Sequence, residues 1–402
     1  MATLARATTN RTKQTRQGFN FPACDSIYRY QASYNSYDGF LYPFAYYEVV
    51  RLMKQKIMDF LLSNADPSIV LRIKKEVLNY ISDNENETLL SKITPQANIQ
   101  TVIKAQKPDG WIGNAFHGRS PAAGAGMLDN MEVGLRFLAE KGLPPENKFI
   151  SKAVHAFFLD EPFHNECRMK APADDYTVTA LGLFHARSSI LIRAGYEYLL
   201  PENDCIDLKH DVNHSFKTFA NVLNYSSLDD VIDTSKRKLC FKEETLWPCS
   251  YDLRMLAHSH SWRTGKNISL LAEALNKLFS FEHECEKMVY TKIKSFYKSP
   301  CLAFIHNQIY CLGLMDENYI NFDLMELFAR CGVVKQVGFL NSKYEHLLSL
   351  VNDDLTVNYK LSPRERNWGP YGGFALEEDW KTKARKQCDL LFRILLIIHY
   401  AE

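Results

Sequence analysis

Glycine and proline are scarce in this sequence. The 402 residues include 18 glycines and 15 prolines, fewer than a sheet-rich chain with many tight turns requires. Hydrophobic residues make up 46% of the chain and aromatic residues 12%, which is enough for a large core. Stacked helix pairs can run to this length as one unit, so the length does not require several domains. The composition therefore favours an all-α fold.

An excess of charge and a long apolar run are both missing. Lys and Arg number 48 and Asp and Glu 47, so the net charge of +1 provides no field that would attract nucleic acid or an anionic membrane. The most apolar run, Leu390 to Ile398, is interrupted by Arg393 and falls short of the roughly 20 residues that span a bilayer. We expect a buried helix there, no transmembrane segment and no nucleic-acid partner.

Cysteine pairs at redox or metal-binding spacing are also absent. The 10 cysteines are scattered, without a Cys-x-x-Cys motif or a secretory leader before them, which indicates reduced thiols in a cytoplasmic protein. Before Asp25 the chain has basic but no acidic residues. This composition fits a transit peptide or a disordered tail, and the tail is favoured. We therefore expect a basic tail over residues 1–22 and one domain over residues 23–402.

Amphipathic helices are the main pattern that is present. Pro67 fits the start of one of them, and a polar stretch over 83–87 interrupts the pattern. Apolar residues recur at three- and four-residue intervals over 42–62, 68–81, 99–105, 176–192, 250–260, 266–281, 339–351 and 382–400.

Three helices end in a glycine that another helix follows closely. These ends are Leu135 to Gly142, Ile190 to Gly195 and Leu327 to Gly332. Glycine adopts the left-handed conformation after a last helical turn at low cost, so each site predicts the corner of an antiparallel helix pair. The spacing is irregular and indicates a degenerate repeat of roughly 45 to 55 residues.

Two aromatic loops carry a resemblance to a known superfamily. The segment Lys104 to Trp111 resembles the glutamine–tryptophan repeat of the α/α-toroid superfamily of terpenoid cyclases and protein prenyltransferase β subunits. The turn from Trp368 to Phe374 and the helix–glycine–helix rhythm from Met127 onward are similar too. The resemblance covers residues 85–400. It implies an α/α toroid whose central funnel takes an apolar ligand, with Trp111, Trp368 and Tyr371 near that ligand.

The catalytic signatures of this superfamily are missing. No Asp-x-Asp-Asp string occurs, although class II cyclases use one to protonate an alkene. No Asp-x-Cys pair occurs either, although protein prenyltransferases bind zinc with one. Gly110 and Trp111 are adjacent, whereas the family usually separates them by one residue. The resemblance therefore implies the fold more than the activity.

The densest polar cluster runs from Trp247 to Arg263. On a helix from Ser250, the side chains of Tyr251, Arg254 and His258 share one face. An imidazole beside a guanidinium has a lowered pKa and can act as a base, and a guanidinium binds carboxylate or phosphate in fork geometry. The face is either a polar pocket or a buried network between helices. Within the cluster we expect catalytic roles for His258, Asp252 and Tyr251. We expect substrate contacts from Arg254, Arg263, Trp262 and His260.

Several other groups could hold a metal ion. Zinc could be bound by Cys249, Asp252, His258 and His260, or by His210 and His214, but neither spacing matches an established site. The string from Asp229 to Asp233 reads as a magnesium-diphosphate motif or as the capped start of a helix. In each case we favour the interpretation without a metal ion, so the sequence assigns no metal and no cofactor.

Carboxylates at loop and helix ends offer a further alternative. Asp174 and Asp175 cap a helix start or, with Glu377 to Asp379, form an acid and base pair as in (α/α)-barrel glycosidases. His117 lies on a turn near Trp111 and could contact the same ligand.

Two functions follow from these patterns. In the first, the funnel binds an isoprenoid or another apolar-tailed substrate, Arg254 and Arg263 anchor its anionic head, and His258 or Asp252 moves a proton, as in a transferase or lyase. In the second, a catalytically silent toroid binds a ligand or a protein partner. The missing signatures favour the second and the polar cluster favours the first.

Overall fold

The computed structural model of the chain describes residues 42–116, 128–158, 163, 176–199, 206–233, 240–242, 247–281, 320–360 and 376–402. Nearly all of them belong to the second of two compact units, Met1–Phe44 and Ala45–Glu402. The basic tail expected over residues 1–22 lies outside the described residues.

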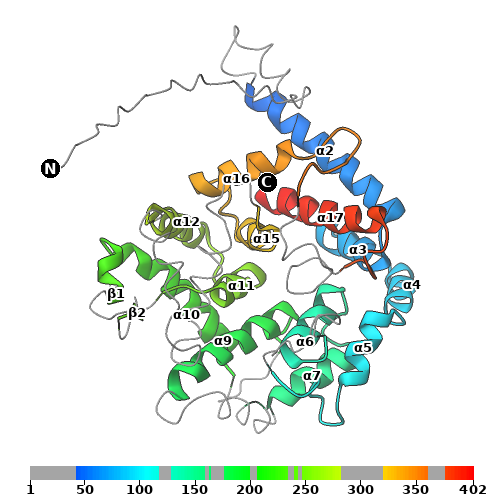
Figure 1. Cartoon of the computed structure of the whole chain (residues 1–402), viewed down its shortest axis with the longest axis horizontal. Coiled ribbons are helices and arrows are strands. Elements are labelled where there is room, and N and C mark those ends of the chain that lie inside the picture. Colours follow the sequence, from blue (N-terminus) through cyan, green and yellow to red (C-terminus); the bar gives the residue numbers. More distant parts are fainter. Residues whose placement is uncertain are drawn as a thin grey trace, which may run out of the picture. The chain divides into compact units, whose positions relative to one another are not determined.

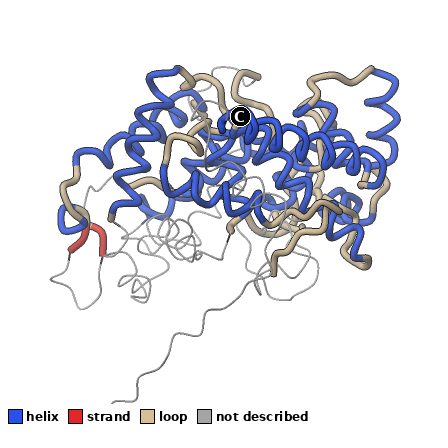
Figure 2. Tube along the Cα trace, turned by 90° about the horizontal axis from the view of Figure 1, so that it is seen from above, coloured by secondary structure: helices blue, strands red, loops and turns tan. Residues whose placement is uncertain are grey.

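Helices form almost all of the regular structure in the described parts of the chain (Figures 1 and 2). This confirms the all-α expectation. The α-helices are α2 (Tyr42–Asn64), α3 (Pro67–Arg72), α4 (Asp83–Ile93), α5 (Ala97–Ala105), α6 (Met131–Glu140), α7 (Lys148–Phe158), α9 (Tyr176–Arg193), α10 (Leu208–Asn221), α11 (Ser250–His258), α12 (Gly265–Ser280), α15 (Phe322–Arg330), α16 (Gly338–Ser349) and α17 (Lys383–Ala401).

The remaining elements are short. A π-helical turn, η1 (Ile73–Val77), continues α3, and two 3₁₀ turns, η2 (Val222–Asn224) and η3 (Leu228–Asp230), follow α10. Strands β1 (Ile232–Asp233) and β2 (Cys240–Phe241) pair in antiparallel register, and Figure 2 shows them apart from the main body of helices. No helix among the described residues is long and apolar enough to cross a membrane.

The three predicted helix ends at glycine are confirmed. Gly142, Gly195 and Gly332 follow α6, α9 and α15 with φ angles of 87°, 89° and 75°, which is the left-handed region that side chains with a Cβ rarely adopt. Each glycine N–H donates to a carbonyl of the helix's last turn. Each helix therefore ends at its glycine and the chain turns away.

Five helices, which we call the central helices, pack in succession. Helix α6 packs against α9, α9 against α11, α11 against α15 and α15 against α17 (Figure 1). The first and last of them also meet α3. Leu71 of α3 lies against the corner at Gly142, and the Arg72 guanidinium lies 5.0 Å from the Phe392 ring centroid. The segment before α6 therefore contacts both ends of the series.

The central helices are buried almost all round. Every residue of α6 is buried, including the charged residues Glu132, Arg136 and Glu140. In α17 the run from Cys388 to Ile398 is buried as predicted, with Arg393 inside it. A helix without a solvent face must satisfy its charged side chains internally. The contacts of these buried charges therefore define the candidate site.

Two local predictions were wrong. The polar stretch 83–87 does not interrupt the helical pattern but begins α4, because the Ser82 hydroxyl caps it and Asp83 and Glu85 favour the positive end of the helix. The helix expected after Ser226 is instead the 3₁₀ turn η3 followed by β1. There the Asp230 carboxylate accepts the backbone N–H groups of Ser226 and Ser227, which closes a turn rather than an α-helix.

Candidate functional site

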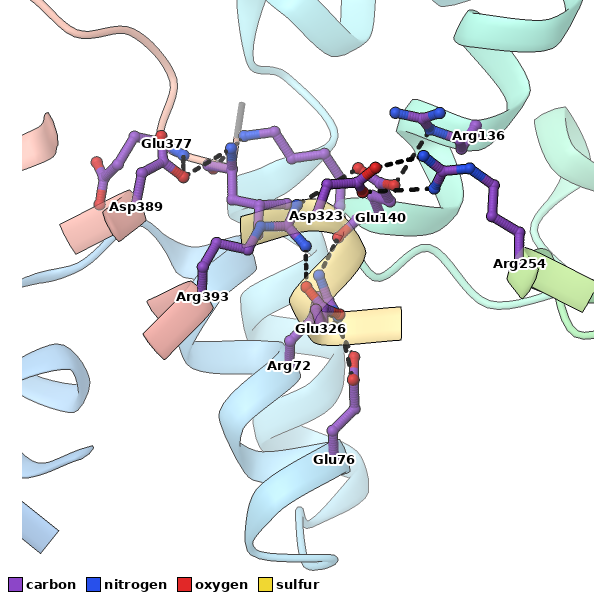
Figure 3. Close-up of polar contacts among 12 residues, drawn as sticks. Arg72, Glu76, Arg136, Glu140, Arg254, Asp323, Glu326, Glu377, Asp389 and Arg393 are labelled. Atoms are coloured by element: carbon purple, nitrogen blue, oxygen red, sulfur yellow. Dashed lines mark hydrogen bonds and ion pairs between the residues drawn. The ribbon is translucent and has the colours of Figure 1, made fainter. Parts of the chain in front are cut away.

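A buried network of charged side chains lies where the central helices meet α3 and η1 (Figure 3). Its core is Glu326 of α15, whose carboxylate bonds the Arg393 guanidinium of α17 and lies 2.8 Å from Nε of Arg330. Glu76 of η1 in turn accepts hydrogen bonds from Arg330 and from Arg72 of α3. Three segments far apart in the sequence are thereby joined through their charges.

A second branch of the network reaches α6 and α11. Asp323 of α15 pairs with the Arg254 guanidinium of α11, and Glu140 lies 3.2 Å from Nε of Arg136. Glu140 also lies 3.7 Å from the Arg393 guanidinium, which connects the two branches. Figure 3 shows Arg136 and Arg254 pointing toward the same carboxylates from different helices.

Three carboxylates of the network, those of Glu326, Glu76 and Asp323, are ionised. Burial alone would raise the pKa of Glu326, but the neighbouring Arg393, Arg330 and Arg72 lower it to about 2. Burial likewise opposes ionisation of Glu76 and Asp323, and arginine charges overcome it: Arg72 and Arg330 lower the pKa of Glu76, and Arg254 and Arg136 lower that of Asp323. Ion pairing therefore holds these three carboxylates charged in the interior.

Two residues at the edge of the network have no such pairing. Within the described residues, Arg193 and His258 make no hydrogen bond or ion pair, and both are partly exposed. Burial and the charge of Arg72 lower the pKa of Arg193 to about 10, so it remains cationic at neutral pH. Burial, Arg193 and Arg330 lower the pKa of His258 well below its ordinary value, so its imidazole is neutral.

The residues of the polar cluster predicted on α11 lie on two different faces of the helix. Tyr251, Arg254 and His258 all face the network, and the Tyr251 hydroxyl donates to Glu132 at 2.9 Å. Asp252 faces the other way and accepts the Ser215 hydroxyl at 2.8 Å. Asp252 therefore does not contact His258, and the two do not form an acid and base pair.

The residues that follow α11 connect helix ends. The Arg263 guanidinium donates to the carbonyls of Leu256, Ala257 and Arg330, so it caps both α11 and α15. The indole N–H of Trp262 donates to the Leu256 carbonyl and its ring is buried. His260 is exposed, and its backbone N–H donates to the carboxylate of Glu197, which follows α9. The guanidinium of Arg263 is thus engaged with the backbone.

The loop that resembles a glutamine–tryptophan repeat connects α5 to α7. The Gln106 side-chain amide at the end of α5 donates to the carbonyls of Gly110 and of Phe149 in α7. The Trp111 ring is buried and meets the Phe157 ring edge-on at 6.0 Å between centroids. Trp111 therefore joins helices in the core and does not contact the network. His117, Trp368 and Tyr371 lie outside the described residues.

One group of side chains has the composition of a metal site. Atoms of His185, Cys249 and Asp252 that can bind a metal lie within 4.8 Å of one another. The predicted partners His258 and His260 are not among them. Of the pair His210 and His214, the first is exposed and lies beside Asp211, while the ring of the second packs against His185.

Of the carboxylates proposed for glycoside chemistry, only those of Glu377, Glu378 and Asp379 lie in the described part of the chain. Asp174 and Asp175 lie outside the described residues. Glu377 is buried, accepts the backbone N–H of Asp66, and lies near Lys141. Burial, with the nearby Asp389, raises the pKa of Glu377 to about 7. Glu378 is not buried, and Asp379 accepts from Arg385 at the surface.

The comparisons with known proteins are negative. No family model, curated protein or solved structure matches this chain. Functional inference therefore depends on the geometry of the described residues.

Sequence reasoning found Arg254, Tyr251 and His258 but missed most of the network. A usable signal is present, because oppositely charged residues stand four apart in three segments of the network: Arg72 and Glu76, Arg136 and Glu140, and Glu326 and Arg330. Arg193 occupies the same place in its helix as Glu140, His258 and Arg330, at the last turn.

Proposed function

We propose that this chain binds a small molecule with an anionic head group, and that Arg193, Arg330 and His258 hold that group at the edge of the charged network. The single observation that carries this proposal is the cationic guanidinium of Arg193, which forms no ion pair within the described residues, although the carboxylates of Glu140 and Glu76 lie near it together with the guanidiniums of Arg72 and Arg330. A charge in that position is costly unless something compensates it. A phosphate or carboxylate would do so in fork geometry.

A neutral imidazole suits the same ligand. His258 can donate a hydrogen bond to an oxyanion from one ring nitrogen while the other stays unprotonated. An anion bound beside it would offset the arginine charges that lower its pKa and so restore its ability to take up a proton. Proton transfer by His258 is therefore a role that a ligand would switch on, consistent with a transferase or lyase.

We further propose that the helices close into an α/α toroid, with the anion site toward its axis. Contacts that run from α3 through α6, α9, α11, α15 and α17 and return to α3 support this arrangement. The groups that act on the Arg193 charge are themselves charged, so an apolar tail of the ligand would have to extend away from the network. An isoprenoid diphosphate has this division between head and tail.

The alternative is a catalytically silent protein whose charges serve only the fold. The completeness of the pairs around Glu326 favours it, since a network of satisfied ion pairs needs no ligand to explain it. The unpaired Arg193 does not fit that explanation. The two functions therefore differ in what removal of the Arg193 charge does to the protein.

Calorimetric titration with inorganic pyrophosphate tests the proposal. We expect binding to wild-type protein and at least about tenfold weaker binding to Arg193→Gln, which corresponds to about 1.4 kcal/mol. Arg51→Gln, which removes an exposed guanidinium on α2, serves as the matched control and should bind like wild type. Farnesyl diphosphate in a second titration tests whether an apolar tail adds affinity.

Thermal unfolding without ligand separates the two functions. Arg193 makes no ion pair within the described residues, and repulsion from Arg72 and Arg330 opposes the attraction of Glu140 and Glu76, so Arg193→Gln should melt close to the temperature of wild type. A melting temperature several degrees lower would mark Arg193 as a structural residue. Equal pyrophosphate affinity in the variant and wild type would contradict the anion site directly.

A further inference from the structure

The group of His185, Cys249 and Asp252 lies on the far side of α11 from the charged network. His185 is on α9, while Cys249 and Asp252 are at the start of α11. Nδ1 of His185 is 3.3 Å from Oδ1 of Asp252, and the three ligand atoms lie within 4.8 Å of one another. Cys249 and Asp252 are each 1% exposed, whereas the His185 side chain is 20% exposed.

The start of helix α11 fixes two of these side chains on one side. Cys249 is the N-cap residue and Asp252 is three residues further on. The Cys249 backbone N–H donates to Oδ2 of Asp252 at 2.7 Å, which leaves Oδ1 directed at His185. The capping arrangement therefore brings a thiol and a carboxylate together for a local reason, and the packing of α9 adds the imidazole.

The donor set matches a borderline-soft divalent ion. Thiolate sulfur, imidazole nitrogen and carboxylate oxygen are the three ligand types that zinc accepts, at about 2.0 to 2.3 Å from the metal. Tetrahedral ligands at those distances lie roughly 3.3 to 3.8 Å apart, and the His185 to Asp252 distance of 3.3 Å already meets this. A thiolate and a carboxylate would balance the charge of a divalent ion, as a buried site requires.

Neighbouring groups would orient the ligands. The Ser215 hydroxyl of α10 donates to Oδ1 of Asp252 at 2.8 Å. The His214 ring packs against the His185 ring with 5.6 Å between centroids and limits its rotation. Such supporting contacts are typical of protein metal sites. They come from a third helix, so the site would tie α9, α10 and α11 together.

We propose that His185, Cys249 and Asp252 bind a zinc ion. Three protein ligands leave a fourth position, and the partly exposed face of His185 provides the approach for a water molecule or a ligand group. The site is separate from the anion site, so each can exist without the other. The competing explanation is a metal-free ion pair between His185 and Asp252 beside an ordinary helix cap.

Cobalt titration of the full-length protein, after removal of metals with a chelator, tests the proposal. We expect a cysteinate-to-cobalt charge-transfer absorption that saturates at one equivalent and that zinc displaces. The chain has 10 cysteines, so the band must be assigned to Cys249. Cys249→Ser keeps a hydroxyl at the N-cap, where serine is favoured, and should therefore fold while losing the band.

Zinc affinity of two variants and one control completes the test. Cys249→Ser and His185→Gln should each bind zinc at least about tenfold more weakly than wild type, and His210→Gln, an exposed histidine on α10, should bind like wild type. Two results would overturn the proposal: absence of the charge-transfer band in the wild-type protein, or zinc affinity that neither Cys249→Ser nor His185→Gln reduces.

Discussion

Glu326→Gln is the change that tests the buried network most directly. The substitution keeps the shape of the side chain but removes the negative charge that faces Arg393, Arg330 and Arg72. The lowering of the Glu326 pKa from 4.5 to about 2 corresponds to about 3 kcal/mol of stabilisation. Removal of one partner from a buried ion pair typically costs about 3 to 5 kcal/mol. Both routes give the same magnitude.

Urea unfolding at neutral pH measures the effect. We expect Glu326→Gln to lower the free energy of unfolding by about 3 kcal/mol or more, with an unchanged dependence on urea concentration. The control is Glu273→Gln on the exposed face of α12, which should change stability by less than about 0.5 kcal/mol. A loss below about 1 kcal/mol in Glu326→Gln would refute the idea that its charge stabilises the core.

The pH dependence of stability tests the role of the Glu326 charge independently. The pKa of Glu326 is depressed in the folded state, so its stabilisation is fully present above pH 4.5 and is lost as the pH falls toward 2. The difference between wild type and Glu326→Gln should therefore shrink over that interval. A difference that stayed constant down to pH 2 would show that the loss comes from packing and not from the charge.

Two further changes probe the Gly110 turn and the buried carboxyl group of Glu377. Gly110→Ala should lose more than about 2 kcal/mol of stability by urea unfolding, because φ is +97° and a Cβ would lie 2.1 Å from the Lys152 carbonyl oxygen; Gly265→Ala, which meets open space, is the control. Glu377 has a folded-state pKa raised to about 7, so wild-type stability should fall as the pH rises from 4.5 through 7. Glu377→Gln, which can still accept the Asp66 N–H, should lack that fall, and identical pH profiles would contradict it.

Local patterns were sufficient for the helices and their corners. Periodicity located α9, α11 and α17 to within a few residues, since an amphipathic helix depends on residues three and four apart. The helix ends at glycine depend on one residue each and were also predicted from the sequence. Helix α4 was missed because the polar residues of its first turn suit a helix start as well as a loop.

The sites depend on contacts that no local pattern contains. Arg193 and Arg330 are the last residues of different helices, and only packing brings them near His258. His185 lies far along the chain from Cys249, so the sequence suggested His258 and His260 as partners instead. What the sequence did contain was the spacing of charged pairs within apolar helices, and that spacing by itself predicts buried ion pairs.

The position of Arg193 at a helix end constrains which ligand can bind. It is the last residue of α9, and Arg330 and His258 are the last residues of α15 and α11. Helix C-termini carry partial negative charge that favours cations and repels anions. A ligand with a single negative charge would gain less against that repulsion than a ligand with two. A ligand with two linked anionic groups can contact Arg193 and Arg330 together, which is why pyrophosphate is the discriminating probe for this site.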